Sequence, residues 1–534
     1  MADVERLPGA HVAFLIAAIV LGFWVKLGSV PLFDLDEGAF SQATVEMLDS
    51  GNYLSTTLNG EPRYDKPILI YWLQAASVSV FGKREFAFRL PSALAATLWL
   101  LVIYHYTFAF TRERSAALLA AGSVALSLMS SIIGHAAIAD ALLNLWIALA
   151  MLDIYRHYRE PERGRLLRVY LWMGLGFLTK GPIAVALPLV VSAVFFVWQR
   201  RPVAWLKAVF NPLGWLVFAG VVLPWIIPLW QKDNGEFLRH FLFDHNFNRY
   251  GTTLQGHGGK PWYYLAVLPL IVLPFTALLP AVFKRARSND PLDRYLLLWF
   301  LIVFMFFSFS GTQLPHYLLY GCTPLFILFG RSWRVVPARF WTLLPALLLT
   351  ALFGALPWLL PQIPLNPDRP YDAGILTLAA SSFDWTYHAM TIGAGLSLLY
   401  LLFVPGLVAR RALLAGALLV GLQLWFAIVP VLAGAQQEPV REAALRAKEL
   451  KLPVVSYHTF LPSFSVYRGA ITPVRLPDPG ELVFVKLDRI PDLQRDLGAN
   501  VTLIPEFKKG GVALLLRQVG PNDPKTTEDV PSQE

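Results

Sequence analysis

The sequence predicts a polytopic α-helical membrane protein with a small α/β domain near its C-terminal end. Three observations lead to this fold class. The 534 residues are 56% hydrophobic and 15% charged, with a mean hydropathy of +0.51. Apolar runs of roughly 18–22 residues, the length that crosses a bilayer core, recur up to about residue 430. Arg and Lys cluster in alternate loops between these runs, as they do on the cytoplasmic side of membrane proteins.

The apolar runs predict about thirteen membrane spans. They lie near residues 10–28, 88–110, 115–133, 141–156, 168–179, 182–199, 212–231, 261–283, 294–309, 315–330, 340–360, 384–404 and 412–430. The segment 67–82 is also apolar, but Gln74 interrupts it. We expect this segment to be an amphipathic loop helix at the extracytoplasmic interface rather than a span.

The net charge of +9 is explained by topology. A basic protein can bind nucleic acid, but here the basic residues gather in alternate loops, as at Arg112 and Arg114 or Arg200 and Arg201. The positive-inside rule makes these loops cytoplasmic. The N-terminus is then cytoplasmic, and an odd number of spans puts the C-terminus outside. We therefore expect no nucleic-acid partner, and a multi-pass membrane protein.

The composition changes after about residue 435, which divides the chain into three parts. We predict a transmembrane domain over 1–434, a periplasmic α/β domain over 435–519 and a disordered tail over 520–534. In the second part, helices are predicted over Glu438–Leu450 and Pro491–Leu497. Strands are predicted over Pro453–Tyr457, Phe464–Tyr467, Glu481–Leu487, Val501–Ile504 and Val512–Leu516.

The segment after the first span is rich in ionisable groups that lie beside the membrane. Asp34, Asp36 and Glu37 follow the span directly. A carboxylate at the edge of a low-dielectric cavity can act as a general base or orient an acceptor. The alternative is an N-cap of the helix that starts near Gly38.

Lys66 and Lys180 also lie on the predicted outer side. Lys66, in the stretch Arg63-Tyr64-Asp65-Lys66, can either extend its ammonium to lipid headgroups or bind the phosphate of a lipid-linked substrate. Lys180 is a lone base that runs against the positive-inside trend, which favours a functional role. Asp140 lies where a span re-enters from outside, and caps that helix or faces the same cavity as Asp36.

Two further outer segments carry His, Arg and Tyr. The loop over 232–260 contains His245, Arg249 and His257, and the segment over 310–316 leads into His316 and Tyr317. Basic groups bind phosphate, whereas Tyr at this depth is also an ordinary interface residue. Asp65, His245 and His257 are weak candidates for a divalent metal, because the two histidines lack local zinc spacing. With no nucleotide-binding motif in the sequence, the substrate itself must supply the energy, or a solute moves down a gradient.

Taken in order, these motifs resemble the GT-C membrane glycosyltransferases related to protein O-mannosyltransferases, and among them the lipid A aminoarabinose transferase (ArnT) subgroup. The resemblance covers most of the chain. It rests on DLDEGAF, RYDKPILIYW, AIADALL, LTKGP, DHNFNRY with GHGGKPWYY, GTQLPHYLLYGCTP and YHTFLPSFSVYRG. Asp65 replaces a Glu usual in the subgroup, Phe40 stands where a Tyr is frequent, and Arg63 where an aromatic residue is frequent. These departures affect the assignment of the sugar.

The resemblance implies roles for individual residues. Asp36 and Asp140 match catalytic acidic positions, while Lys66, Arg249 and Tyr317 match the group that binds the donor phosphate. It places further residues around the substrate cavity, namely Asp34, Glu37, Arg63, Tyr64, Lys180, His245, His257 and His316.

The function implied is an inverting transfer of a sugar, with 4-amino-4-deoxy-L-arabinose as the candidate, from undecaprenyl phosphate to an extracytoplasmic acceptor such as a lipid A phosphate. The resemblance implies a monomeric enzyme that requires no cofactor, with a divalent metal as the alternative. Another sugar, or a glycan or protein acceptor, is left open. A polyprenyl-lipid transporter or flippase is a further alternative, but its ionisable residues should lie at mid-membrane in two matching halves, which the sequence does not show.

Overall fold

The computed structural model describes residues 9–241 and 260–519. The packing of the described chain divides it into two units. Unit 1 consists of the N-terminal segment up to Val30, Ala43–Leu356 and Asp384–Pro430. Unit 2 combines Pro31–Gln42, Pro357–Phe383 and the segment that begins at Val431. The predicted boundary near residue 434 lies close to the start of this last segment, but unit 2 also contains two earlier segments that the sequence analysis assigned to the transmembrane domain.

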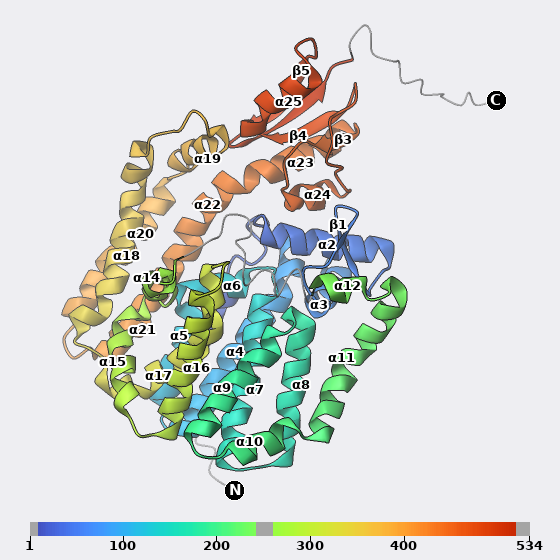
Figure 1. Cartoon of the computed structure of the whole chain (residues 1–534). Helices are drawn as coiled ribbons and strands as arrows, with labels where there is room; N and C mark the ends of the chain where they lie inside the picture. Colours follow the sequence, from blue (N-terminus) through green and yellow to red (C-terminus); the bar gives the residue numbers. More distant parts are fainter. Residues whose placement is uncertain (1–8, 242–259, 520–534) are drawn as a thin grey trace. The chain divides into compact units, whose positions relative to one another are not determined.

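Unit 1 is a bundle of apolar helices. Neighbouring helices in the chain pack against one another, as α7, α8 and α9 do (Figure 1). Its first helices are α1 (Gly9–Ile19), α3 (Leu69–Phe81), α4 (Glu85–Thr111), α5 (Arg114–Leu126), α6 (Leu128–His135), α7 (Asp140–Arg159), α8 (Arg163–Lys180), α9 (Ile183–Trp198), α10 (Pro202–Val209), α11 (Pro212–Asp233) and α12 (Glu236–Arg239). The later ones are α14 (Tyr263–Ile271), α15 (Leu279–Lys284), α16 (Pro291–Ser308), α17 (Cys322–Arg331), α20 (Trp385–Phe403) and α21 (Ala409–Gln423).

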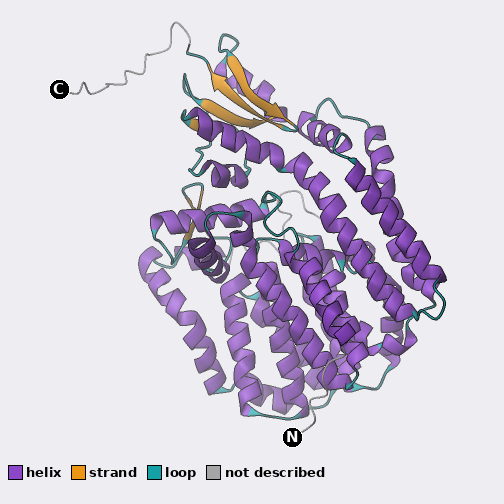
Figure 2. Ribbon diagram, turned by 180° about the vertical axis from the view of Figure 1, so that it is seen from behind, coloured by secondary structure: helices purple, strands orange, loops and turns teal. Residues whose placement is uncertain are grey.

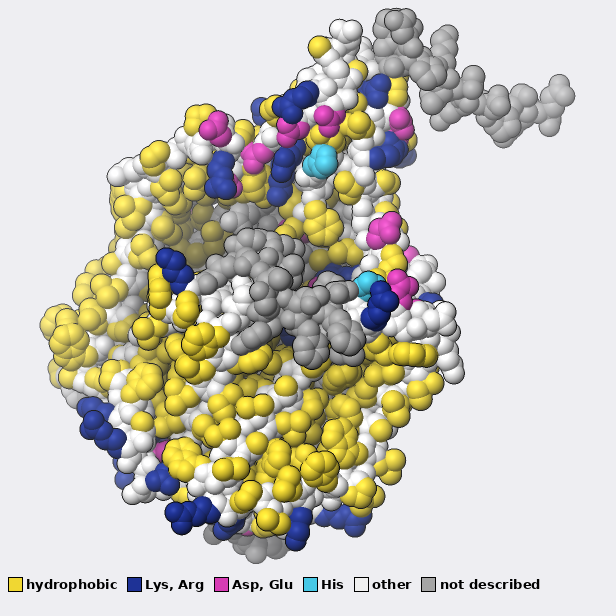
Figure 3. Space-filling model, in the orientation of Figure 1, with side chains coloured by type: hydrophobic (Ala, Val, Ile, Leu, Met, Phe, Trp, Pro, Cys, Tyr) yellow, Lys and Arg dark blue, Asp and Glu magenta, His cyan; other side chains and the backbone are white. Residues whose placement is uncertain are grey.

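Several of these helices have the length and composition of membrane spans. In the described part of the chain, six helices qualify, or eight if each of two bent pairs counts as one span. Figure 3 shows hydrophobic side chains covering the bundle, with Lys and Arg gathered near α10. Exposed apolar residues of the described helices include Val197, Leu216 and Ile227. The count of thirteen spans stays a prediction.

Two predicted spans are broken in the structure. The run 115–133 becomes α5 and α6, bent by 61° at Ser127, and the run 261–283 is bent by 111° after α14. The second break lies next to Pro274, which cannot donate a backbone hydrogen bond. The two breaks share a backbone hydrogen bond, because the amide of Leu128 donates to the carbonyl of Leu273 at 2.9 Å.

The apolar segment 67–82 forms the 13-residue helix α3, which is too short to cross a bilayer. Gln74 does not face solvent. It is fully buried, and its amide donates to the carbonyls of Phe88 and Ala137 at 3.1 and 3.0 Å. Burying an amide is tolerated only when it is hydrogen-bonded, so Gln74 ties α3 into the bundle.

The C-terminal part of unit 2 is a four-stranded sheet with helices on it (Figure 2). The strand order is β3-β4-β6-β5, with β3 and β4 parallel and the other pairs antiparallel. The strands are β3 (Val454–Ser456), β4 (Leu482–Lys486), β5 (Leu503–Lys509) and β6 (Val512–Arg517). The helices of unit 2 outside the first loop are α19 (Pro370–Ala380), α22 (Val429–Gln436, which begins in unit 1), α23 (Glu438–Leu450), α24 (Pro462–Arg468) and α25 (Ile490–Leu497).

The strand periodicity determines how the helices cover this sheet. Leu482 and Phe484 of β4 share one core cluster with α23 and α24, whereas Val483 and Val485 share another with Leu493 of α25. Alternate residues of a strand point to opposite faces, so both faces of β4 are buried.

The predicted strand over Phe464–Tyr467 is wrong, because this segment is helical in α24. Its alternation of apolar and polar residues suggests a strand, but Pro462 occupies the first turn, where proline favours a helix start. In the helix, Phe464 stacks on Phe484 with ring centroids 4.0 Å apart. The helices predicted over Glu438–Leu450 and Pro491–Leu497 correspond to α23 and α25.

Candidate functional site

A buried ionic cluster in unit 1 centres on Asp140. Asp140 is the first residue of α7 and is 4% exposed, and Lys180 is the last residue of α8. Because α7 and α8 form an antiparallel pair, the start of one helix meets the end of the other. The Lys180 ammonium donates to Asp140 Oδ1 at 2.7 Å and to the Tyr320 hydroxyl at 2.8 Å. The Tyr320 hydroxyl in turn donates to the Asp140 carboxylate.

The 3₁₀ helix Pro315–Gly321 adds aromatic and imidazole groups to this cluster. His316 Nε2 lies 3.7 Å from Asp140 Oδ1. The Lys180 ammonium lies 5.3 Å from the ring centroid of Tyr317 and 5.6 Å from that of Tyr320, within range of cation–π attraction. Residues three apart are eclipsed in a 3₁₀ helix, which explains why both tyrosines reach the same lysine.

The structure therefore brings together candidates from three separate motifs, namely Asp140, Lys180 and the pair His316 and Tyr317. Tyr320 is the residue of this cluster that the sequence analysis did not select. Its three-residue spacing from Tyr317 was the available sign, but that spacing is informative only once the segment is known to be a 3₁₀ helix.

A second cluster in unit 1 lies at Arg63, Asp65 and Lys66. The Asp65 carboxylate accepts from the Arg63 guanidinium at 3.2 Å and from the Lys66 ammonium at 2.7 Å. The Lys66 side chain is only 12% exposed. A snorkelling lysine extends its ammonium into water, whereas here the Lys66 ammonium is held against the Asp65 carboxylate.

Tyr64 lies beside this cluster and stacks on an imidazole. Its ring is parallel to that of His240, with centroids 5.0 Å apart, and it meets Phe237 edge-on at 5.8 Å. Both partners come from α12 and the residue that follows it. The aromatic contacts hold the chain next to Asp65 and Lys66.

The first-loop carboxylates belong to unit 2 and differ in their surroundings. Asp36 is the first residue of α2 (Asp36–Ser50) and is exposed, whereas Glu37 is 4% exposed. Glu37 Oε2 accepts from the amide of Phe33 at 2.8 Å. Asp34 Oδ1 accepts from the amide of Ser463 at 3.0 Å, and the Ser463 hydroxyl donates to Oδ2. Asp36 is thus exposed between two hydrogen-bonded acids.

Burial affects the titration of Asp34. It raises the pKa of this carboxyl to about 7, while the hydrogen bonds from Ser463 act in the opposite direction. The neighbouring charge of Glu37 raises the pKa further, and that of Lys486 lowers it. Asp34 therefore titrates near neutral pH.

The remaining predicted residues lie outside the described part of the chain. These are Arg249, His245 and His257. Of the three metal candidates, Asp65 is described, and it pairs with Arg63 and Lys66. Within residues 9–241 and 260–519, no group of three or more His, Cys, Asp or Glu side chains has the arrangement of a metal site.

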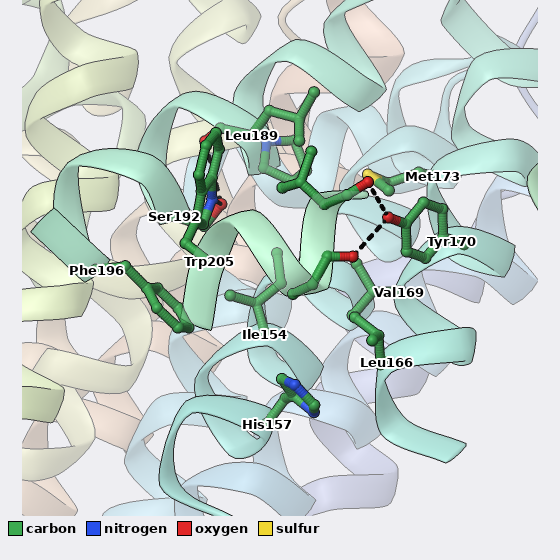
Figure 4. A pocket seen from close by; sticks show the side chains of 13 residues that line it. Ile154, His157, Leu166, Val169, Tyr170, Met173, Leu189, Ser192, Phe196 and Trp205 are labelled. Atoms are coloured by element: carbon green, nitrogen blue, oxygen red, sulfur yellow. Dashed lines mark hydrogen bonds between the residues drawn. The ribbon is translucent and has the colours of Figure 1, made fainter. Parts of the chain in front are cut away.

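A separate cavity of about 50 Å³ lies between α7, α8, α9 and the end of α10 (Figure 4). Its lining is mainly apolar, and Tyr170 beside it donates to the carbonyls of Ala208 and Val209. Tyr170 precedes Lys180 by ten residues of α8, or about 15 Å along the helix. This cavity is therefore distinct from the charged cluster.

Comparisons with known proteins agree with this fold and with these motifs. The family model described as dolichyl-phosphate-mannose-protein mannosyltransferase matches residues 65–230. That segment includes Lys66, Asp140 and Lys180.

Curated relatives carry the name undecaprenyl phosphate-alpha-4-amino-4-deoxy-L-arabinose arabinosyl transferase. The protein from Shewanella sediminis is 30% identical over 331 residues, which cover 59% of this chain and 59% of the relative. The protein from Aeromonas salmonicida is 32% identical over 321 residues, which cover 59% of this chain and 58% of the relative. The chain thus spans about three fifths of the length of these relatives.

Solved structures match along nearly the whole chain. The crystal structure of ArnT from Cupriavidus metallidurans bound to undecaprenyl phosphate has a TM-score of 0.80 at 20% identity, covering 97% of this chain and 99% of that one. Its apo state has a TM-score of 0.78 at 18% identity, covering 95% of this chain and 97% of that one. The chain therefore has the fold of these two ArnT structures, an α-helical multi-pass membrane protein with a small C-terminal sheet domain. Over about three fifths of its length its sequence is similar to the arabinosyl transferases.

Proposed function

We propose that this protein is an inverting glycosyltransferase. It moves a sugar from undecaprenyl phosphate to an acceptor outside the cytoplasm, with 4-amino-4-deoxy-L-arabinose as the sugar and a lipid A phosphate as the acceptor. The observation that carries the proposal is the buried cluster of Asp140, Lys180, His316 and Tyr317, in a chain whose relatives are named as arabinosyl transferases for this donor.

The chemistry needs charge stabilisation at the leaving group. An acceptor oxygen attacks the anomeric carbon from the face opposite the lipid phosphate, and the bond between that carbon and the phosphate oxygen breaks. Undecaprenyl phosphate leaves with the electron pair, and cations placed where this charge develops lower the barrier. We assign this role to Lys66, Arg249 and Tyr317.

Asp36 is proposed to orient the acceptor and to take its proton. Its exposure at the start of α2 leaves the carboxylate accessible. If the acceptor is an ionised phosphate, little base strength is required, and Asp36 mainly positions it. Asp140 is proposed to hold Lys180 and His316 in place, since its carboxylate already accepts from Lys180 and Tyr320.

The proposal also covers the orientation of the protein in the membrane and its need for a cofactor. We propose that the protein is a monomer in a bacterial inner membrane, with its N-terminus cytoplasmic and the C-terminal sheet domain periplasmic. No cofactor is required, because the phosphate ester of the donor supplies the energy. Transfer that persists in the presence of a divalent-metal chelator supports this, and its loss identifies the metal-dependent alternative.

The central experiment is a transfer assay with the full chain purified in detergent. The donor is undecaprenyl-phosphate-linked 4-amino-4-deoxy-L-arabinose, and mass spectrometry detects its addition to lipid A. Asp36→Asn should reduce transfer by about 10²–10⁴-fold, the usual contribution of a general base. Asp49→Asn, in the last turn of the same helix and paired with Lys83 at the surface, is the matched control. Wild-type activity in Asp36→Asn would remove Asp36 from this role.

A further inference from the structure

The short helix α24 of the C-terminal domain is hydrogen-bonded to the loop that carries Asp36. Both the first turn and the last turn of α24 contact this loop. Ser463, near the start of α24, binds both carboxylate oxygens of Asp34. The Tyr467 hydroxyl, near its end, accepts from the amide of Leu32 at 2.7 Å. Two anchor points fix both the place and the direction of the chain immediately before Asp36.

A close approach at Gly38 keeps this contact tight. A Cβ atom at this position would lie 2.0 Å from Asp34 Oδ1 and 2.7 Å from the amide nitrogen of Ser463. Real Cβ atoms do not approach other atoms so closely, so only glycine fits here without a shift. The first turn of α2, the Asp34 carboxylate and the start of α24 therefore pack as one layer.

Helix α24 is in turn fixed to the sheet. The rings of Phe464 and Phe484 stack at 4.0 Å, with 14° between their planes, and both are 1% exposed. The Ser465 hydroxyl of the same helix donates to Thr472 at 3.0 Å, away from the sheet strands and the first loop. The sheet holds α24, α24 holds Asp34, and Asp34 lies two residues before Asp36.

Asp34 is poorly placed to act on a substrate itself. Both of its oxygens accept from Ser463, and the side chain is partly buried. The exposed carboxylate of this loop is Asp36. The two acids are suited to different tasks, one to holding the loop and the other to contacting substrate.

We propose that the Asp34–Ser463 contact positions Asp36 for the reaction, so that the C-terminal domain is a working part of the catalytic machinery. Asp34 is a positioning residue, and Ser463 is its anchor. This inference rests on the proposed role of Asp36. A displacement of about 1 Å at a reacting group can cost about 100-fold in rate, which sets the size of the expected effect.

The test compares substitutions at the two partners in the same transfer assay. Asp34→Ala should lower kcat by about 100-fold and change the KM for the lipid-linked donor by less than about threefold. Asp34→Asn should recover kcat to within about threefold of wild type, because its amide oxygen still accepts from the Ser463 amide. Ser463→Ala, which keeps the amide contact, should fall between the two. Ser465→Ala removes a hydroxyl from the same helix and should leave kcat unchanged.

A second measurement keeps the test valid if Asp34→Ala is poorly folded. Hydrogen exchange of the peptide covering residues 31–42 should be faster in Ser463→Ala than in wild type, and unchanged in Ser465→Ala. Wild-type kcat and wild-type exchange in both Asp34→Ala and Ser463→Ala would overturn the inference. So would an Asp34→Asn variant as inactive as Asp34→Ala, since the carboxylate charge itself would then be needed. Full activity of Asp36→Asn would instead overturn the role of Asp36 on which this inference rests, whereas a wild-type protein that transfers no sugar would overturn the proposed function.

Discussion

Two carboxylates removed from water in this protein are stabilised in different ways. Asp140 is paired with the Lys180 ammonium and accepts from Tyr320, so its charge is balanced inside unit 1. Asp34 accepts hydrogen bonds from Ser463, and burial raises its pKa to about 7 although the charge of Lys486 acts in the opposite direction. A buried charge left without compensation is strongly unfavourable. Asp140 should therefore depend on its cation, whereas Asp34 should depend on pH.

Removing the partner of Asp140 should destabilise the protein. Lys180→Met leaves a buried carboxylate without its cation, at a cost of about 3–5 kcal/mol, and Asp140→Asn with Lys180→Met should recover most of the loss. Thermal unfolding in detergent measures both. Lys83→Met breaks the exposed pair with Asp49 and should cost about 0–1 kcal/mol. Equal losses for Lys180→Met and Lys83→Met would contradict the buried pairing.

The raised pKa of Asp34 predicts a pH dependence of stability with a definite sign. The folded protein binds this proton more tightly than the unfolded chain, whose pKa is near 3.8. The contribution is fully present below that value and is lost as the pH rises through about 7. Between pH 5 and pH 8, the unfolding temperature of wild type should fall relative to that of Asp34→Asn, which does not titrate. Parallel curves for the two proteins would show that Asp34 has an ordinary pKa.

At the scale of helices, small residues set how closely neighbours pack. Gly330 of α17 faces α5, and a Cβ there would lie 2.4 Å from the carbonyl oxygen of Ala116 and 3.0 Å from Cβ of Ala120. Small residues at such crossings let helix backbones approach each other within a membrane. The contact therefore depends on the missing side chain.

Gly330→Ala should push α5 and α17 apart and destabilise the protein by about 1–3 kcal/mol. At Gly354, in α18 (Arg339–Leu359), no described atom beyond the adjacent backbone of that helix lies within 4 Å of the place a Cβ would occupy. Gly354→Ala should be neutral or stabilising by up to about 1 kcal/mol, because alanine favours a helix. The unfolding temperatures of the two variants measure the difference. A loss in Gly354→Ala as large as in Gly330→Ala would show that the effect is not one of packing.

Local patterns predicted many elements but missed where they bend. Helices such as α4, α11 and α23 follow from apolar runs or from amphipathic spacing within one segment. The breaks at Ser127 and after Ile271 depend on a hydrogen bond between Leu128 and Leu273, which are far apart in the sequence. The residues on either side of a break do not reveal such a distant partner. For the same reason, the segment around Phe464 was predicted as a strand although it is helical.

At the scale of the whole molecule, the sequence identified residue types better than their partners. The motifs selected Asp140, Lys180 and His316 from three distant segments, and the structure brings them together. The sequence did not indicate that Pro31–Gln42 packs with the C-terminal domain, because the contact joins residues 429 positions apart. The distribution of Arg and Lys along the sequence indicates membrane orientation, but it does not indicate which distant segments contact each other.

The proposed topology can be tested with single cysteines. The native Cys322 is buried, so it should contribute little background labelling. Lys448→Cys in α23 and Ala204→Cys in α10 both replace exposed residues. A membrane-impermeant maleimide should label Lys448→Cys in intact spheroplasts, and Ala204→Cys only after lysis. Labelling of Ala204→Cys in intact spheroplasts would reverse the assignment based on the Arg-rich loops.

The contact between α24 and the first loop determines when, during translation, Asp36 can reach its final position. Asp36 leaves the ribosome more than four hundred residues before Ser463. The loop can reach its final geometry only after Ser463 has been synthesised. A chain that has been translated only as far as Tyr317 would therefore contain every predicted donor-binding residue and still lack the contact that positions Asp36. On the proposed mechanism it would be inactive until α24 has folded.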